Sequence, residues 1–213
     1  MRRLLKILGK QTTKKFESKE KLKMTGILLA GGKSTRMGTN KAFLELDGQT
    51  LVERSLSVLQ NTFVEVLISS NQPEFYPYGV RIIPDIFPEM GPLSGLHACL
   101  QAASFDQCFF VACDMPFLQE DLIRFLAGLS EGYDVTVPRA AGGLNPLHAF
   151  YHKNCLPKIE NNLKSGRLKI IDFYHKCNVR YVEEHELNGF GDLAMIFSNV
   201  NTPEEWDLIQ KLK

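Results

Sequence analysis

The sequence predicts an α/β protein, a single-domain three-layer α/β/α sandwich around a mainly parallel sheet. Three observations indicate this fold. Short apolar runs alternate with segments that carry apolar residues at helical spacing, an order typical of a parallel sheet with helices on both faces. No repeat or low-complexity linker interrupts the 213 residues, a length that suits one such domain. Hydrophobic residues make up 44% of the chain, which is enough for a sizeable core.

Each predicted strand is a short apolar or β-branched run. The first, MTGILLA, is continuously apolar, VEVLIS is rich in β-branched residues, and CFFVA has the composition of a buried strand. A three-residue strand, RII, ends at Pro84. The predicted strands are 24–30, 64–69, 81–83, 108–112, 135–137 and 147–151.

The predicted helices carry apolar residues at helical spacing. One of them follows Gly91-Pro92, and the last begins after Thr202-Pro203, where threonine suits the N-cap and proline the first helical position. The predicted helices are 51–59, 93–102, 118–129, 156–163 and 203–212.

Polar segments follow four of the predicted strands. The loop GGKSTRMGTNK follows 24–30, and Asn71, Asp85 and Asp114 lie just beyond the next three strands in chain order. Open α/β sheets bind ligands at the carboxyl ends of their strands. Glycines, cations, an amide and two carboxylates are therefore expected to converge on one rim of the sheet.

The glycine-rich loop lacks the P-loop pattern. A P-loop requires a glycine five residues before Gly32, and that position holds Ile27. It lacks the GxGxxG dinucleotide fingerprint as well. Two glycines directly after a buried strand still allow backbone N–H groups to approach an anion closely. Lys33, Arg36 and Lys41 add the charge that a triphosphate needs. The alternative is a surface loop with scattered cations.

Asp114 directly follows the apolar run CFFVA and Cys113. Burying a carboxylate at the end of an apolar strand is costly unless it is paired or holds a metal. Mg²⁺ is bound through one or two carboxylates together with substrate phosphate oxygens. The sequence thus favours Asp114 as a magnesium ligand, and the alternative is an N-cap for the following helix.

Two neighbouring features have two interpretations each. Asp85 either caps a turn or binds nucleotide or assists the metal, and Asn71 either contacts a base or ribose or makes an Asx-turn. The segment GPLSG at 91–95 opens a helix whose N-terminus favours an anion, or it simply initiates that helix.

The C-terminal half offers weaker candidates. Asn199 and Asn201 alternate about Val200, so both are expected on one side of a short strand, where they hold an acceptor or the water shell of the metal, or merely form turns. His148 is the one histidine near the predicted rim, and its catalytic role is unsupported. Three cations around Gly166 either contact an anionic acceptor or are solvated: Lys164, Arg167 and Lys169.

Charge is distributed unevenly along the chain. Residues 1–23 hold nine of the 25 Lys and Arg and two of the 24 Asp and Glu, a net charge of +7, so the remainder holds 16 basic and 22 acidic residues and carries −6. A core that binds nucleic acid is normally basic, which argues against a nucleic-acid partner. The arm 1–23 is expected to be disordered, to be a start-site extension before Met24, or to bind an anionic partner. The folded domain is expected at 24–213.

A cytoplasmic protein without a membrane partner is expected. No apolar run approaches the roughly 20 residues that a membrane span needs. The basic arm also lacks the apolar region and cleavage site of a secretory signal. The five cysteines are odd in number and form no CxxC, so reduced thiols are expected and a zinc site is not.

The segment LLAGGKSTRMGTNK resembles the signature loop of the bacterial molybdenum cofactor guanylyltransferases, within the glycosyltransferase-A-like nucleotidyltransferases. Three further blocks match in order and at suitable spacing, so the resemblance covers residues 25 to about 210. They are Asp85 with GPLSG, CDMP at 113–116 and NVNTP at 199–203. Cytidylyl- and uridylyltransferases share the loop, whereas NVNTP and the short length favour the guanylyl branch.

The resemblance implies a Rossmann-like sheet of the nucleotide-diphospho-sugar transferase type and the transfer of GMP from Mg-GTP to Mo-molybdopterin, with release of pyrophosphate. It implies that Arg36, Lys41 and Asp114 are catalytic and that Asp114 binds Mg²⁺. The implied nucleotide-binding residues are Leu29, Ala30, Gly31, Lys41, Asn71, Asp85 and Asp114. A monomer or weak oligomer with transient contacts to other molybdenum cofactor proteins is expected.

Two features depart from the family pattern. The basic arm before Met24 is not part of it, and segment 144–147, LNPL, stands where family members often carry an acidic or histidine residue before the Pro-Leu pair. Two other functions stay open: a cytidylyl- or uridylyltransferase acting on another phosphorylated small molecule, and a non-enzymatic GTP-binding or chaperone-type module for molybdopterin. The presence of Lys41 and Asp114 argues against the non-enzymatic module.

Overall fold

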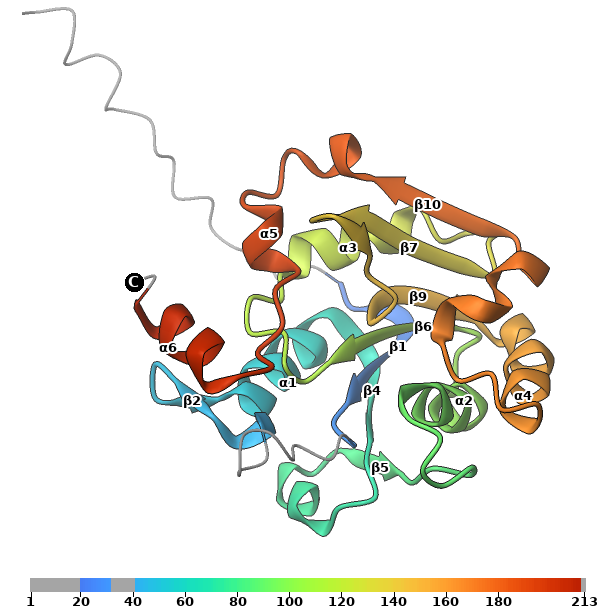
Figure 1. The fold of residues 1–213 in the computed structure, drawn as a ribbon, viewed down its shortest axis with the longest axis horizontal. Coiled ribbons are helices and arrows are strands. Elements are labelled where there is room, and N and C mark those ends of the chain that lie inside the picture. The colour runs from blue at the N-terminus through green and yellow to red at the C-terminus, as the bar shows by residue number, and fades with distance from the viewer. Residues whose placement is uncertain (1–19, 32–40, 212–213) are drawn as a thin grey trace, which may run out of the picture.

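A computed structural model describes residues 20–31 and 41–211 of the chain (Figure 1). Its strands are β1 (Leu22–Leu29), β2 (Glu45–Leu46), β3 (Gln49–Thr50), β4 (Phe63–Ser69), β5 (Arg81–Ile83), β6 (Gln107–Ala112), β7 (Val135–Ala140), β8 (Gly143–Leu144), β9 (His148–His152) and β10 (Val179–Glu183). Its α-helices are α1 (Leu51–Thr62), α2 (Pro92–Ala102), α3 (Glu120–Gly128), α4 (Leu156–Lys164), α5 (Leu193–Ile196) and α6 (Pro203–Lys211). Short 3₁₀ segments are Lys41–Phe43, Pro73–Tyr78, Lys153–Cys155, Ile170–Lys176 and Glu184–Leu187.

The main sheet has the strand order β10-β7-β9-β6-β1-β4-β5, with β8 paired to β7. Strand β1 runs parallel to both β4 and β6, and β4 runs parallel to β5. Strand β9 lies antiparallel between β6 and β7, and β10 is again parallel to β7. The sheet is therefore mainly parallel, as the sequence predicts, with two reversed strands, β8 and β9, that periodicity alone does not distinguish.

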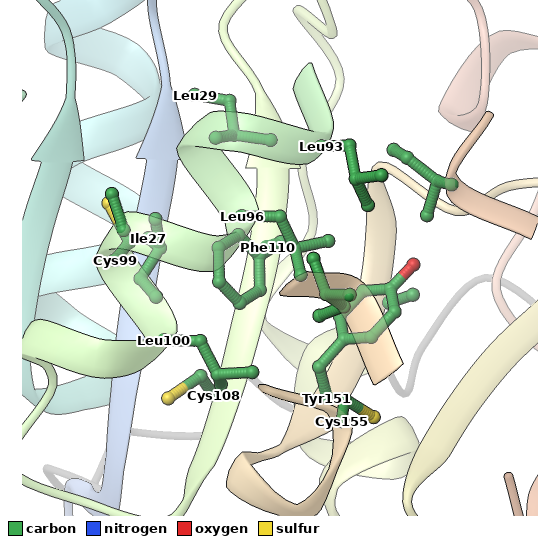
Figure 2. Packing of buried hydrophobic residues seen from close by; sticks show 14 of the residues in the cluster. Ile27, Leu29, Leu93, Leu96, Cys99, Leu100, Cys108, Phe110, Tyr151 and Cys155 are labelled. Carbon is green, nitrogen blue, oxygen red and sulfur yellow. The ribbon is translucent and has the colours of Figure 1, made fainter. Parts of the chain in front are cut away.

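Successive residues of the central strands point to opposite faces of the sheet. Ile27 and Leu29 of β1 pack with residues of α2 and α4, whereas Leu28 packs on the other face with residues of α1, α3 and α5. Figure 2 shows the first of these clusters, in which Leu93 and Leu96 of α2 lie over the sheet beside Phe110 of β6. The two clusters make the predicted three-layer α/β/α sandwich.

The predicted elements are found within a few residues of their expected bounds. Strand β1 begins at Leu22, two residues earlier than expected, and α3 begins at Glu120 rather than 118. The prediction of disorder or extension for the basic arm falls largely on residues 1–19, which lie outside the described residues. The helices in the described part of the chain are too short or too polar to span a membrane.

Several local features differ from the prediction, among them the short elements β8 and α5, which have no counterpart in it. Strand β10 was not predicted, because it lies at the edge of the sheet and Val182 is its one fully buried side chain, so it shows no alternating apolar pattern. The hairpin β2–β3 was missed too, although Asp47 and Gly48 give it a two-residue turn with φ of 57° and 73°. The short strand expected around Val200 is wrong, because residues 198–202 form no strand.

Candidate active site

The carboxyl ends of β1, β4, β5 and β6 lie level at one edge of the sheet. Leu29 pairs with Ser69 on one side and with Ala112 on the other, and Ser69 pairs with Ile83. The pairing continues past the strand ends, where the backbone N–H of Cys113 donates to the carbonyl oxygen of Leu29 at 3.0 Å. The segments that follow these strands are therefore held side by side.

A cleft of about 580 Å³ opens at this edge. All seven residues predicted to bind nucleotide or metal line it: Leu29, Ala30, Gly31, Lys41, Asn71, Asp85 and Asp114. The structure thus brings together side chains from four separate strand ends and from the 3₁₀ segment at Lys41. Lys33 and Arg36, the other two predicted phosphate-binding cations, lie outside the described residues.

Asp114 lies in the turn that follows β6, with its side chain 21% exposed. Its backbone carbonyl accepts a hydrogen bond from the N–H of Val200 at 2.9 Å. Its Oδ1 atom is buried and accepts no hydrogen bond from any residue in 20–31 or 41–211. Burial raises the pKa of this carboxyl above its usual range, and the charge of Lys41 opposes that rise. Helix α3 begins six residues later, so Asp114 does not cap it.

The unpartnered oxygen fits a bound cation. A buried carboxylate oxygen without a donor is costly, and a metal ion would remove that cost. No group of three or more His, Cys, Asp or Glu in the described part of the chain could hold a metal ion. A single carboxylate is compatible with Mg²⁺, which takes one or two carboxylates and completes its shell with phosphate oxygens and water.

Lys41 connects Asp114 to the C-terminal segment. Its Nζ lies 3.1 Å from Oδ1 of Asn201, to which it donates a hydrogen bond, and 3.9 Å from Oδ2 of Asp114. The Lys41 side chain is only 16% exposed, so its charge acts in a partly desolvated setting, where Coulombic effects are larger than in bulk water. The hydrogen bond to Asn201 thereby orients the ammonium group of Lys41 toward the cleft.

A small separate core holds this C-terminal segment in place. Leu46 and Leu51 pack with Val200, and Ile209 and Trp206 of α6 complete the cluster. Figure 1 shows α6 beside the β2 hairpin, although the two are far apart in the sequence. Since Val200 is fully buried in this cluster, the adjacent Asn201 is held beside Lys41, which lines the cleft.

Helix α6 begins with the predicted cap. The N–H of Glu205 donates to Oγ1 of Thr202 at 3.2 Å, and Oε2 of Glu205 in turn accepts from the N–H groups of Thr202 and Asn201 at 3.1 and 2.6 Å. This reciprocal arrangement satisfies donors at the start of the helix. It also fixes the backbone of Asn201 directly beside Lys41.

Asn71 and Asp85 form a reciprocal pair on the other side of the cleft. Nδ2 of Asn71 donates to Oδ2 of Asp85 at 3.0 Å, and the N–H of Asp85 donates to Oδ1 of Asn71 at 2.9 Å. Burial raises the pKa of the Asp85 carboxyl, and the hydrogen bond from Asn71 opposes the rise. Asn71 therefore does not form an isolated Asx-turn. Its side-chain amide links the segments that follow β4 and β5.

Helix α2 begins at the cleft, and its N-cap residue provides no side-chain hydrogen bond to the first turn. Gly91 is the N-cap residue, with a φ of 68° that favours glycine, and Pro92 follows at the first helical position. One turn later Gly95 lies against β4, where an added Cβ would come within 2.3 Å of Oγ of Ser69. Gly91 thus permits a backbone conformation with positive φ, and Gly95 permits close packing of α2 against β4.

His148 is not a cleft residue. It is fully buried, with its ring in edge contacts with Phe109 and Phe197 at centroid distances of 5.2 and 5.1 Å. Burial lowers its pKa to about 3, so the imidazole is neutral at physiological pH. Neither ring nitrogen has a hydrogen-bond partner among the described residues. The histidine is part of the core.

The three cations around Gly166 do not line the cleft. Lys164 forms an ion pair with Glu160 at 2.6 Å, and Arg167 donates to Oδ1 of Asn162 at 3.3 Å. The loop before α2 contributes two cleft residues that the sequence does not mark, Pro88 and Glu89. Glu89 has a φ of 62° in the turn before α2, and nothing in a single sequence marks such a turn residue.

The fold and the cleft agree with comparisons to known proteins. Residues 26–179 match the family model described as MobA-like NTP transferase domain. The chain belongs to the MobA-like NTP transferase family. Among curated relatives, a "Probable molybdenum cofactor guanylyltransferase" of Pelotomaculum thermopropionicum is 45% identical over 185 residues, which cover 86% of this chain and 90% of the relative. A "Molybdenum cofactor guanylyltransferase" of Desulfosudis oleivorans is 37% identical over 185 residues, 85% of this chain and 92% of the relative.

Solved structures place this MobA-like NTP transferase in the same fold. The molybdopterin-guanine dinucleotide biosynthesis protein A of Archaeoglobus fulgidus superposes with a TM-score of 0.78 at 26% identity, over 89% of this chain and 98% of that one. A 2-C-methyl-D-erythritol 4-phosphate cytidylyltransferase of Thermus thermophilus superposes with a TM-score of 0.65 over 90% of this chain and 98% of that one. Its 18% identity shows a shared fold.

Proposed function

We propose that this MobA-like NTP transferase moves GMP from Mg-GTP to the terminal phosphate of Mo-molybdopterin in the cytoplasm and releases pyrophosphate. The relatives that cover most of the chain are named for guanylyl transfer to this cofactor. One structural observation carries the proposal: the Lys41 ammonium and the Asp114 carboxylate meet on one cleft wall, with Asn201 holding the ammonium. We assign the catalytic domain to residues 24–213.

The triphosphate would lie along the wall formed by the end of β1 and by Lys41. Among the described residues, an added Cβ at Gly31 would meet Ser69 O at 3.7 Å and Ser70 Cα at 3.9 Å and no other atom within 4 Å, which leaves room for a phosphate on this side of the turn. Backbone N–H groups near a glycine can approach an anion closely. The nucleoside would lie toward Asn71 and Asp85 on the opposite wall of the cleft.

Asp114 would hold Mg²⁺ through the oxygen that has no donor among the described residues. When bound, Mg²⁺ supplies positive charge that offsets the negative charge of the phosphates. The buried carboxylate is ionised more readily beside a cation, because an opposite charge lowers its raised pKa. Lys41 would neutralise the pyrophosphate that leaves, and Arg36 is assigned the same task from the sequence.

No general base is needed for the transfer. A phosphate dianion of the acceptor is already a nucleophile, so the enzyme has to position it in line with the α-phosphate and stabilise the developing charge. The site fits this requirement, since Lys41 lines the cleft, Asn201 accepts its hydrogen bond, and the buried His148 lies in the core. Preorganised groups of this kind act by electrostatic stabilisation.

The reaction can be tested with purified protein, Mo-molybdopterin and each of the four nucleoside triphosphates in Mg²⁺ buffer. Pyrophosphate release and the dinucleotide product are measured together. We expect product and pyrophosphate in equal amounts with GTP and at least about tenfold less with CTP or UTP, which corresponds to roughly 1.4 kcal/mol of discrimination. Preferred use of CTP or UTP would support the cytidylyl- or uridylyltransferase alternative, and binding of GTP without product would support a non-enzymatic module.

A further inference from the structure

Two thiols approach each other outside the cleft. Sγ of Cys155 lies 4.0 Å from Sγ of Cys177, in the part of the fold where α4 begins and the 3₁₀ segment Ile170–Lys176 ends. Neither cysteine lines the cleft. Figure 2 shows Cys155 beside Tyr151 at the margin of the core cluster. The pair is separated by 22 positions in the sequence, so its proximity is a product of the fold.

The two thiols differ in accessibility and in partners. Cys155 is fully buried and its Sγ donates to the carbonyl oxygen of Asp134 at 3.2 Å, whereas Cys177 is half-buried. Lys158 lies next to both, held by an ion pair with Asp134 at 2.8 Å. The arrangement places the half-buried Cys177 near the Lys158–Asp134 ion pair, with the sulfur of the buried Cys155 4.0 Å from its own. Thiols that react with oxidants are partly exposed and have a cation nearby.

We propose that Cys155 and Cys177 form a reversible disulfide when a small hydroperoxide reaches the protein. The Cys177 thiolate attacks one peroxide oxygen, the O–O bond breaks, and a sulfenic acid and hydroxide result. The Cys155 sulfur then attacks the Cys177 sulfur, and the sulfenic hydroxyl leaves as water with the proton of the Cys155 thiol. Overall, two thiols lose two electrons to one hydroperoxide. For hydrogen peroxide the products are one disulfide and two waters.

The charges around the pair are consistent with this order of events. The contact with the Cys155 sulfur lowers the pKa of Cys177, burial opposes this effect, the Lys158 charge lowers the pKa further, and the Asp134 charge raises it. The pKa of Cys155 is raised, first by that same contact and then by burial. The other three thiols are less reactive, because burial raises the pKa of Cys99, Cys108 and Cys113 to about 12. A disulfide here would tie the start of α4 to the segment before β10.

The test is treatment of the folded full-length chain with hydrogen peroxide, followed by unfolding, alkylation and mass spectrometry. We expect the alkylatable thiols to fall from five to three, with the peptides that contain Cys155 and Cys177 linked and with full reversal by dithiothreitol. The matched control Cys99→Ala should show the same loss of two thiols. Retention of all thiols, or linkage of any other pair or of two chains, would overturn the proposal.

Two variants test the order of the steps. In Cys155→Ala, Cys177 should stop at the sulfenic acid, which dimedone labels, whereas in Cys177→Ser the remaining Cys155 should stay reduced. Both variants are checked for folding by circular dichroism before oxidation. Dimedone labelling of Cys155 in Cys177→Ser, to the extent seen for Cys177 in Cys155→Ala, would contradict the assignment of Cys177 as the first thiol to react.

Discussion

Nζ of Lys41 donates a hydrogen bond to Oδ1 of Asn201 at 3.1 Å, across 160 positions of the sequence. The contact joins the end of the glycine-rich loop to the C-terminal segment. It also places the ammonium group 3.9 Å from Oδ2 of Asp114. The end of the glycine-rich loop, the turn after β6 and the C-terminal segment therefore meet at one point beside the cleft.

Asn201→Ala should lower kcat/KM for GTP by about tenfold, because the loss of one hydrogen bond to a charged group costs about 1.5 kcal/mol. The matched control is Asn161→Ala, on the exposed side of α4, which should leave kcat/KM unchanged. Steady-state pyrophosphate release measures both. Equal kcat/KM for Asn201→Ala and Asn161→Ala would show that the orientation of Lys41 does not matter for catalysis.

Asp114→Asn should lose about 10²-fold in turnover, the size of effect expected when one preorganised stabilising group is removed. The same variant should be at least as stable as the wild type near pH 7, because it removes a carboxylate whose ionisation burial disfavours. Asp106→Asn is the control, since Asp106 lies at the opposite end of β6 and is exposed. Thermal unfolding and single-turnover rates check the two expectations. A large loss of stability in Asp114→Asn would make its activity uninformative, and Asp114→Glu would then be needed.

Alanine substitutions at Gly26 in β1 and at Gly31 in the turn that follows should affect different properties, stability in the first case and GTP binding in the second. Gly26→Ala should lower stability, because the new Cβ would lie 2.5 Å from Cδ2 of the buried Phe63 ring. Gly31→Ala should leave the melting temperature unchanged and raise the KM for GTP, because the described residues leave space there that we assign to the triphosphate. Differential scanning fluorimetry and GTP titration separate the effects. An unchanged KM in Gly31→Ala would argue against a phosphate beside this turn.

The stability of the protein should depend on the charge of His148 below neutral pH. The pKa of His148 is lowered to about 3, so the unfolded chain, with a histidine pKa near 6.5, binds the proton first as the pH falls. Between these values the native state should lose about 1.4 kcal/mol per pH unit through this residue. His148→Leu should remove that loss, whereas His175→Leu, at an exposed position, should retain it. Urea unfolding at pH 7.5 and pH 5.0 gives the comparison, and equal pH dependence in wild type and His148→Leu would contradict it.

Much of the fold follows from local sequence pattern. The apolar runs at β1, β4 and β6 are long enough to identify buried strands, and their shared edge predicts which loops meet. Strand β10 and the reversal of β9 depend on long-range pairing with β7 and β6, which leaves no periodic signal in the chain. The same reason explains why the sequence did not reveal the direction of these strands.

The cleft was predicted more completely than the contacts within it. Segments after strand ends are recognisable, so Gly31, Lys41, Asn71, Asp85 and Asp114 follow from the sequence pattern, whereas Leu29 and Ala30 were implied by the family resemblance. Their partners are not, because Asn201 reaches Lys41 only after Val200 packs with Leu46 and Leu51 in a separate small core. Similarly, the pairing of Asn71 with Asp85 depends on the register of β4 and β5. Contacts of this kind require the assembled fold.

The central claim is that GTP binds in this cleft as a magnesium complex held by Asp114. Calorimetric titration with GTP, in Mg²⁺ and then in EDTA, tests it in the wild type and in Asp114→Asn. We predict that Mg²⁺ strengthens GTP binding to the wild type by at least about tenfold, or roughly 1.4 kcal/mol, and changes binding to Asp114→Asn by less than about twofold. An equal gain from Mg²⁺ in both proteins would place the metal elsewhere and contradict the assignment.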